Sequence, residues 1–115
     1  MRAILTWERT ITAVLVASVM IVAAGVAARA EGVAISVKGH HFQPAEVQAP
    51  ANKPLALRVK NLDAVPMEFE SVSLRVEKVI APGSEGTVNV RALAPGRYEF
   101  FDDFHQETRG VLVVK

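Results

Sequence analysis

At 115 residues, the chain has room for a single domain built around one hydrophobic core. It contains no cysteine, which excludes disulfide staples, thiol catalysis, zinc–thiolate sites and iron–sulfur clusters. Its 13 Lys and Arg residues nearly balance its 12 Asp and Glu residues, and no basic run interrupts that balance, so nothing in the charge pattern indicates a nucleic-acid partner.

Residues 1–30 have the pattern of a secretory signal peptide. Arg2 and Arg9 flank a short polar start, an apolar run covers 11–28, and Ala-Arg-Ala at 28–30 matches an A-x-A cleavage site. We therefore expect cleavage after Ala30. An uncleaved membrane anchor is the alternative, because the run is near the lower limit of about 18 residues for a span. Either way, we expect residues 31–115 to form a domain that is delivered across a membrane.

From Glu31 onward, short apolar or alternating runs are separated by Pro, Gly and Asn, and no helical period is sustained. The expected strands are 33–37, 45–48, 55–60, 67–71, 74–79, 86–91, 97–101 and 111–114. Short strands without helices between them predict an all-β, antiparallel sandwich or barrel. Because residues 111–114 are apolar on both faces, we expect them to lie in the interior of a sheet.

Three segments carry side chains suited to chemistry. They are His40-His41, the run Pro-Met-Glu-Phe-Glu-Ser at 66–71, and the stretch from Tyr98 to Gly110. The last of these contains Asp102 and His105 in a loop before the final strand. Loops at one end of a sandwich are where ligands usually gather.

Residues 42–115 resemble the cupredoxins. In that family a strand of the form Tyr-x-Phe-x-Cys is followed by a loop His and then a Met. Here Asp102 stands in the place of the Cys, His105 in the place of the loop His, and Thr108 in the place of the Met. Met67 occupies the place of the first His of the family. The resemblance implies a Greek-key β-sandwich of seven or eight strands.

These departures change the metal chemistry that the resemblance implies. A blue-copper centre needs a thiolate, and this chain has none. A carboxylate at Asp102 favours harder cations such as Fe(II), Fe(III) or Mn(II), whereas the thioether of Met67 is a soft ligand. A site of His105, Asp102 and Met67 could therefore hold either iron or copper.

The Glu-Phe-Glu-Ser run that follows the turn and the Asp-Phe-His run before the last strand are similar to those of the cupredoxin-like subunit of bacterial ferrous iron-uptake systems. That resemblance implies iron handling in the periplasm, with oxidation of Fe(II) before transport as one form of it. It also implies partners, namely a second periplasmic iron-binding protein and a membrane iron permease complex with a ferredoxin-like protein.

Several site residues also have a purely structural interpretation. Asp102 and His105 could form a hydrogen-bonded pair that orders a loop, and Met67 could pack in the core. Glu68 and Glu70 share the strand face opposite to Met67, where they are either solvated or form an outward carboxylate pair that accepts iron.

Other charged positions are expected to face solvent. His40 and His41 point to opposite sides of an extended segment, so at most one of them can face a given site. We expect this pair to face solvent. Asp103 and Glu107 are expected to be solvated loop charges, with a role in supporting neighbouring metal ligands as the alternative. Two other functions remain open, a copper-binding carrier or electron-transfer protein and a metal-free binding module, and whether the protein is an enzyme stays undecided.

Overall fold

The computed structural model describes residues 30–115, so the expected signal segment lies outside the described residues except for Ala30. These residues form nine strands: β1 (Glu31–Lys38), β2 (His41–Gln43), β3 (Glu46–Ala49), β4 (Leu55–Asn61), β5 (Met67–Ser71), β6 (Val76–Ile80), β7 (Glu85–Val90), β8 (Gly96–Asp102) and β9 (His105–Val114). Within residues 30–115, no helix is long and apolar enough to span a bilayer.

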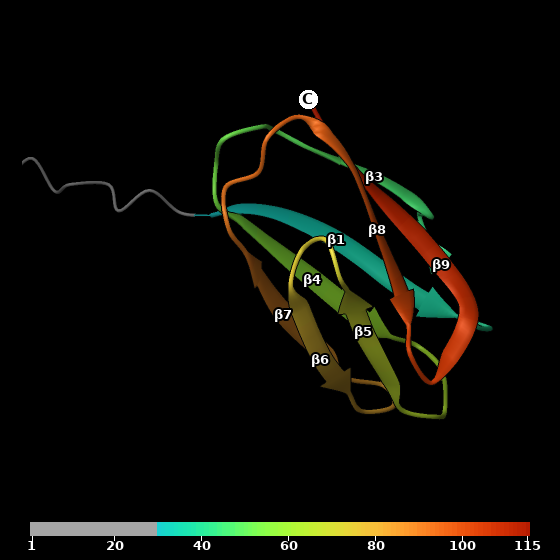
Figure 1. Ribbon diagram of the computed structural model, residues 1–115. Helices are drawn as coiled ribbons and strands as arrows, with labels where there is room; N and C mark the ends of the chain where they lie inside the picture. The colour runs from blue at the N-terminus through green and yellow to red at the C-terminus, as the bar shows by residue number, and fades with distance from the viewer. Residues whose placement is uncertain (1–29) are drawn as a thin grey trace, which may run out of the picture.

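The strands form two sheets packed face to face (Figure 1). One has the order β2-β1-β4-β7 and the other the order β3-β9-β8-β5-β6. Alternating residues explain the packing: in β4, Leu55, Leu57 and Val59 are buried, while Arg58 and Lys60 are exposed. The expected all-β Greek-key sandwich is confirmed.

An aromatic cluster lies in the core between the sheets. Phe42 of β2 packs edge-on against Phe100 of β8 at 4.8 Å between ring centroids, and Phe69 of β5 stacks on Phe100 at 5.0 Å. Such geometries add to the energy of burial by about 0.5–1.5 kcal/mol per pair. The cluster therefore ties β2, β5 and β8 together across the two sheets.

The sheets differ from expectation in two respects. They are mixed rather than purely antiparallel, because β1 pairs with β4 and β3 pairs with β9 in parallel. The structure also has one strand more than the seven or eight expected, because the short β2 forms a hairpin with β1. Three residues are too few to show an alternating pattern in the sequence.

Strand β9 is much longer than the expected 111–114. Residues 105–110 are mostly polar, but both ends of this segment pair with β8: Arg109 and Gly110 face Phe101 and Phe100, and after a register shift His105 faces Asp102. The apolar end of β9 lies between β3 and β8, so its expected place in the interior of a sheet is confirmed. The polar start of β9 thereby brings His105 and Thr108 onto a rigid strand rather than a loop.

Three connections meet at one end of the sandwich, which we call the turn end: residues 39–40 between β1 and β2, residues 62–66 between β4 and β5, and residues 103–104 between β8 and β9. Asp63 accepts hydrogen bonds from the backbone N–H groups of Gly39 and His40, at 2.6 and 3.0 Å. Both acceptor oxygens belong to one carboxylate, so this side chain locks the first connection to the second.

Candidate metal centre

The structure separates the five sequence-predicted ligands into three environments. Asp102 and His105 lie together at the turn end, 3.0 Å apart between Oδ2 and Nδ1. Glu68 and Glu70 point outward from β5, whereas the Met67 side chain is 1% exposed and belongs to the hydrophobic core. The alternation expected along this strand is therefore present.

Asp102 uses its carboxylate to hold the backbone. Its Oδ1 accepts hydrogen bonds from the N–H groups of Glu68, at 2.9 Å, and Phe104, at 3.0 Å. Its Oδ2 contacts His105, and the side chain is 1% exposed. The carboxylate thus joins β5, the β8–β9 turn and the start of β9.

His40 is partly exposed and lies against His105, whereas His41 is exposed. The two ring centroids are 4.2 Å apart, with a tilt of 39° between the ring planes. The β1–β2 turn brings His40 beside His105, and Gly39 and His40 both have positive φ there, at 58° each. Thr108 of β9 is buried, and its hydroxyl donates a hydrogen bond to the His40 carbonyl oxygen at 2.6 Å.

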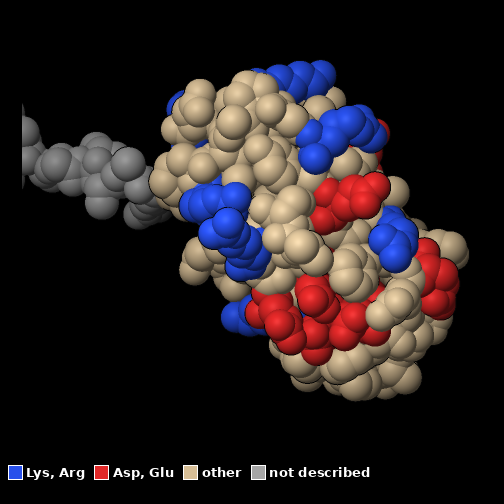
Figure 2. Space-filling view, viewed as in Figure 1, with Lys and Arg blue, Asp and Glu red and all other residues tan. Residues whose placement is uncertain are grey.

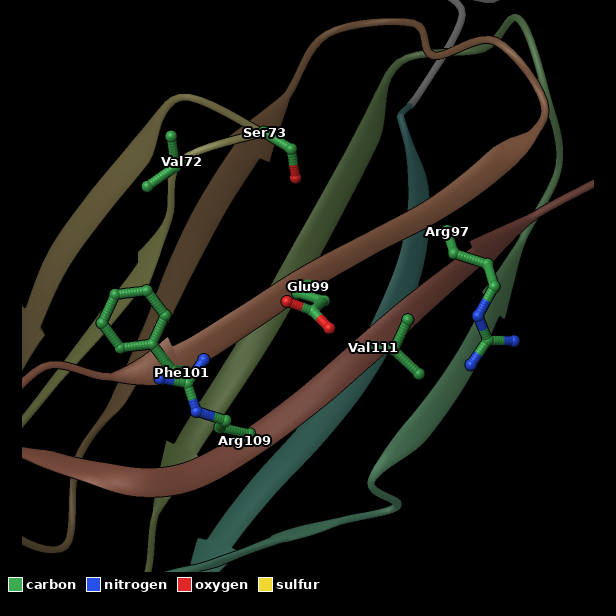
Figure 3. Close-up of a pocket in the computed structure, with 7 residues that line it drawn as sticks. All are labelled: Val72, Ser73, Arg97, Glu99, Phe101, Arg109 and Val111. Atoms are coloured by element: carbon green, nitrogen blue, oxygen red, sulfur yellow. The ribbon is translucent and has the colours of Figure 1, made fainter.

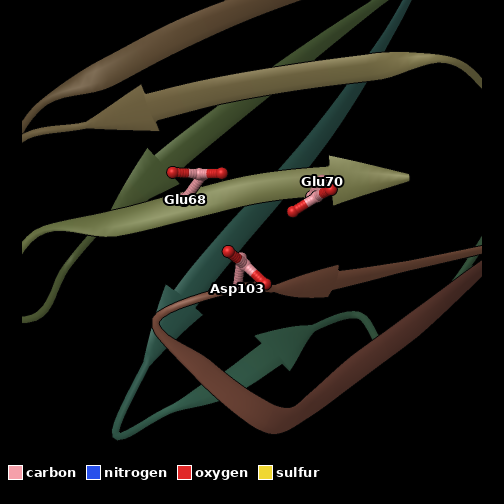
Figure 4. Close-up of side chains that lie close together, drawn as sticks. All are labelled: Glu68, Glu70 and Asp103. Carbon is pink, nitrogen blue, oxygen red and sulfur yellow. The ribbon is translucent and has the colours of Figure 1, made fainter. Parts of the chain in front are cut away.

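A second cluster lies on the outer face of the five-stranded sheet. Glu68, Glu70 and Asp103 each offer a carboxylate oxygen, and these oxygens all lie within 4.8 Å of one another. Figure 4 shows the three carboxylates, two from β5 and one from the turn that follows β8. Oxygen ligands on opposite sides of one ion lie roughly 4–5 Å apart, at metal–oxygen distances of about 2.1–2.5 Å. The cluster, which we call the carboxylate site, therefore fits one cation.

The carboxylate site is crowded with negative charge. The pKa of Glu68 is raised to about 7, first by a hydrogen bond shared with the carboxyl of Glu77 and then by burial and the neighbouring charges. Burial, Asp103 and Glu77 also raise the pKa of Glu70. Within residues 30–115, no Lys or Arg forms an ion pair with these four groups. A bound cation would relieve their repulsion.

Figure 2 shows the wider charge pattern on this face. Acidic side chains gather over β5 and β6, and the Lys and Arg side chains lie around them. Glu77 of β6 is the register partner of Glu70 in β5. The negative field therefore extends beyond the three grouped carboxylates.

The backbone links the two clusters directly. Glu68 donates its N–H to Asp102 and accepts a hydrogen bond from the N–H of Asp103 through its carbonyl oxygen, at 2.9 Å in both cases. Gln106 donates to Asp103 Oδ1 at 3.0 Å. Asp102 inside the sandwich thus holds the segment from which Glu68 and Asp103 project outward.

Sequence reasoning missed three members of these clusters. Asp103 was expected as a solvated loop charge; it does face outward, but its place beside Glu68 and Glu70 was not expected. Glu77 is placed beside Glu70 by the β5–β6 register. His40 reaches His105 only through the positive-φ turn, for which Gly39 is the single visible signal.

The same sheet face carries a groove (Figure 3), one of whose lining residues, Phe101, is the register partner of Glu70. It is lined by Arg97, Phe101, Arg109 and Val111, among others. The Arg109 guanidinium lies 5.2 Å from the centroid of the Phe101 ring. None of the five predicted ligands lines it.

A thiolate–copper centre does not fit these residues. The chain has no cysteine. The carboxylate at the corresponding place is buried and has both oxygens engaged with protein groups. Every buried side-chain nitrogen and oxygen of residues 30–115 has a hydrogen-bond partner, so no orphaned donor or acceptor remains inside. The donor set available on the surface consists of carboxylates and imidazoles.

Comparison with known proteins supports the fold. A family model described as a cupredoxin-like domain matches residues 10–114. An uncharacterized protein of Rickettsia prowazekii (strain Madrid E) is 39% identical over 83 residues, which are 71% of this chain and 66% of that protein. The match thus spans slightly less than two thirds of the relative.

Solved structures with the same fold are more distant in sequence. The metal-binding domain of the Cu(I)-exporting P-type ATPase of Streptococcus pneumoniae D39, with Cu(I), superposes with a TM-score of 0.67 at 16% identity, covering 73% of this chain and 84% of that chain. Auracyanin of Roseiflexus castenholzii gives a TM-score of 0.62 at 16% identity, covering 75% and 98%. With the family model matching most of its length, this chain belongs to the cupredoxin-like domain family.

Proposed function

We propose that this protein binds ferrous iron as cargo at the carboxylate site. The observation that carries the proposal is Glu68, which is only 9% exposed and whose carboxylate nevertheless faces Glu70 and Asp103 with no cationic side chain paired to it in residues 30–115. The hydrogen bond shared with Glu77 and the neighbouring charges favour the protonated form of Glu68, and a bound cation would offset the same repulsion.

The chemistry of the site favours a hard or borderline cation. Carboxylates suit such ions better than they suit Cu(I). The four acidic groups, with Glu77 included, also form a local negative potential that attracts cations from solution. Because the site lies on an outer sheet face, a bound ion is accessible to a partner protein.

The iron assignment draws on the resemblance of two sequence segments to the cupredoxin-like subunit of ferrous iron-uptake systems. Those segments contribute Glu68, Glu70 and Asp103, which are grouped in space. We infer that the protein works in the periplasm and passes iron to a membrane iron permease complex, alongside a second periplasmic iron-binding protein.

The test is an anaerobic Fe(II) titration of the purified protein by calorimetry, compared with Glu70→Gln and Asp103→Asn. Glu107→Gln is the matched control, because it removes one exposed carboxylate from β9 outside the site. We expect one equivalent of Fe(II) to bind, with at least a tenfold loss of affinity in the two site variants and none in the control.

Two results would contradict the proposal. Equal Fe(II) binding by Glu70→Gln and by the unmodified protein would show that the carboxylate site is not used. Full displacement of Fe(II) by millimolar Mg(II) or Ca(II) would show a general cation site, and the iron role would then fall.

A further inference from the structure

A pair of imidazoles at the turn end stands outside the carboxylate site. The His40 and His105 rings are 4.2 Å apart between centroids, and their side chains are 44% and 28% exposed. The hydrogen bonds and ion pairs of residues 30–115 use only Nδ1 of each ring. Each Nε2 is therefore left without a protein partner in the described part of the chain.

A carboxylate lies beside the Nδ1 of each ring. Asp102 Oδ2 is 3.0 Å from Nδ1 of His105, and Asp63 Oδ2 is 3.9 Å from Nδ1 of His40. Histidines that ligate metals ordinarily donate their other ring N–H to a carboxylate, which fixes the tautomer and the ring orientation. His105 therefore has the hydrogen-bond partner that leaves its Nε2 as a metal ligand, and the Asp63 carboxylate lies near Nδ1 of His40 beyond hydrogen-bond distance.

The position of His40 is fixed by the fold. The N–H groups of Gly39 and His40 donate to Asp63, and the pKa of Asp63 is lowered chiefly by the hydrogen bond from His40. Thr108 holds the His40 carbonyl oxygen from β9, the strand that carries His105. Three contacts thus hold a left-handed residue beside a second histidine, although such a conformation costs energy outside glycine.

We propose that His40 and His105 together bind one imidazole-preferring divalent metal ion, with Cu(II) bound most tightly, through their Nε2 atoms. Two imidazoles in adjacent positions on one ion, each about 2.1 Å from it, have ring centroids about 4–5 Å apart. The observed separation is within that range. Copper(II) forms the strongest complexes with nitrogen ligands among the first-row divalent ions.

This site is independent of the proposed iron function. It uses nitrogen ligands from β9 and the β1–β2 turn, whereas the carboxylate site uses oxygen ligands from β5 and the β8–β9 turn. It also differs from a thiolate centre in its ligands, which are two nitrogens. His105 would bind the ion through Nε2, because its Nδ1 is engaged by Asp102.

The experiment is a Cu(II) titration of the purified protein against a competing chelator, with electron paramagnetic resonance of the one-equivalent complex. The variants are His40→Asn, which keeps a residue that tolerates positive φ, and His105→Gln. His41→Gln is the matched control, because His41 is the exposed neighbour in β2. We expect a loss of at least tenfold in Cu(II) affinity in either site variant, and none in the control.

The spectrum adds a readout that loss of folding does not mimic. We expect coupling to two imidazole nitrogens in the unmodified protein and to one in each site variant, while Glu70→Gln leaves the spectrum unchanged. Unaltered affinity and coupling in His40→Asn would overturn the proposal. Loss of Cu(II) binding in Glu70→Gln would also overturn it, because copper would then occupy the carboxylate site.

Discussion

Asp102 is a buried side chain that stabilises the fold through the groups it binds. Its oxygens accept two backbone N–H groups and contact His105, so removing the side chain leaves one buried and one partly buried donor without an acceptor. Each such loss costs about 1–3 kcal/mol. We expect Asp102→Ala to lower the free energy of unfolding by about 2–5 kcal/mol, measured by urea denaturation.

Asp102→Asn is the informative companion to that variant. An amide retains one oxygen, which can still accept from the N–H groups of Glu68 and Phe104. We therefore expect a smaller loss than in the alanine variant. Equal losses in the two variants would show that charge, rather than the hydrogen bonds to the backbone, makes Asp102 necessary for the fold.

The raised pKa of Glu68 predicts an unusual pH dependence of stability for the metal-free protein. Its pKa is about 7 in the folded state against an ordinary value of 4.5, so the folded state binds the proton more tightly than the unfolded state does. This contribution to stability is fully present below pH 4.5 and is lost as the pH rises through 7. We expect the urea midpoint to fall over that window in chelator-treated protein.

Glu68→Gln separates this effect from the other titrations of the protein. A neutral amide cannot titrate, so the fall in the urea midpoint between pH 4.5 and 7 should become shallower. A slope unchanged by the substitution would assign the pH dependence to other groups. It would also remove the argument that Glu68 is electrostatically strained without a cation.

The pairing of β8 with β9 depends on the absence of a side chain at Gly110. A Cβ built there would lie 2.4 and 2.5 Å from two atoms of the Phe100 ring and 3.0 Å from the carbonyl oxygen of Ala45. Phe100 is the register partner of Gly110 and is fully buried. Overpacking a tight core typically costs about 1–3 kcal/mol.

We therefore expect Gly110→Ala to destabilise the protein by at least that amount in thermal or urea unfolding. Gly32→Ala is the matched control, because Gly32 is also in a strand and its Cβ would have no atom within 4 Å. If Gly110→Ala unfolds at the same urea concentration as the control, the Phe100 ring must be able to move aside, and the contact between β8 and β9 is less tightly packed than the structure indicates.

Strands were predictable where burial alternates and not where tertiary contacts determine the structure. The pattern at residues 55–60 fixes the faces of β4, and the alternation around Glu68 and Glu70 places both outward. The polar start of β9 has no such signal, because Thr108 is buried where its hydroxyl bonds to the β1–β2 turn, which is distant in sequence. His40 was missed for the same reason, since its neighbour is 65 residues away in sequence.

The grouping of the acidic residues was predictable in part. Residue types and alternation indicated an outward carboxylate pair. The third member, Asp103, joins that pair because β5 and β8 are antiparallel neighbours. No local sequence pattern predicts which distant strands become neighbours. The relative positions of the carboxylate site and the imidazole pair likewise depend on the order of the strands in the two sheets.

At the scale of the whole molecule, the hydrophobic core is separate from both groups of candidate metal ligands. The core is a continuous hydrophobic cluster that involves both sheets. Both metal-binding candidates lie at its surface, and the buried polar side chains of residues 30–115 are all hydrogen-bonded. We therefore expect the metal-free protein to unfold in one cooperative transition, unlike small domains whose folding depends on a structural metal.

Metal binding should then add only the stability that mass action gives. A ligand at a hundred times its Kd stabilises the folded state by about 2.7 kcal/mol. For a domain of this size, that corresponds to a rise in Tm of about 10–20 °C. Circular dichroism melts under anaerobic conditions with Fe(II) at that excess should show such a rise in the unmodified protein and none in Glu70→Gln. If the metal-free protein instead lacked a cooperative transition, the carboxylate repulsion would outweigh the core, and iron would have to be a structural component and not a cargo.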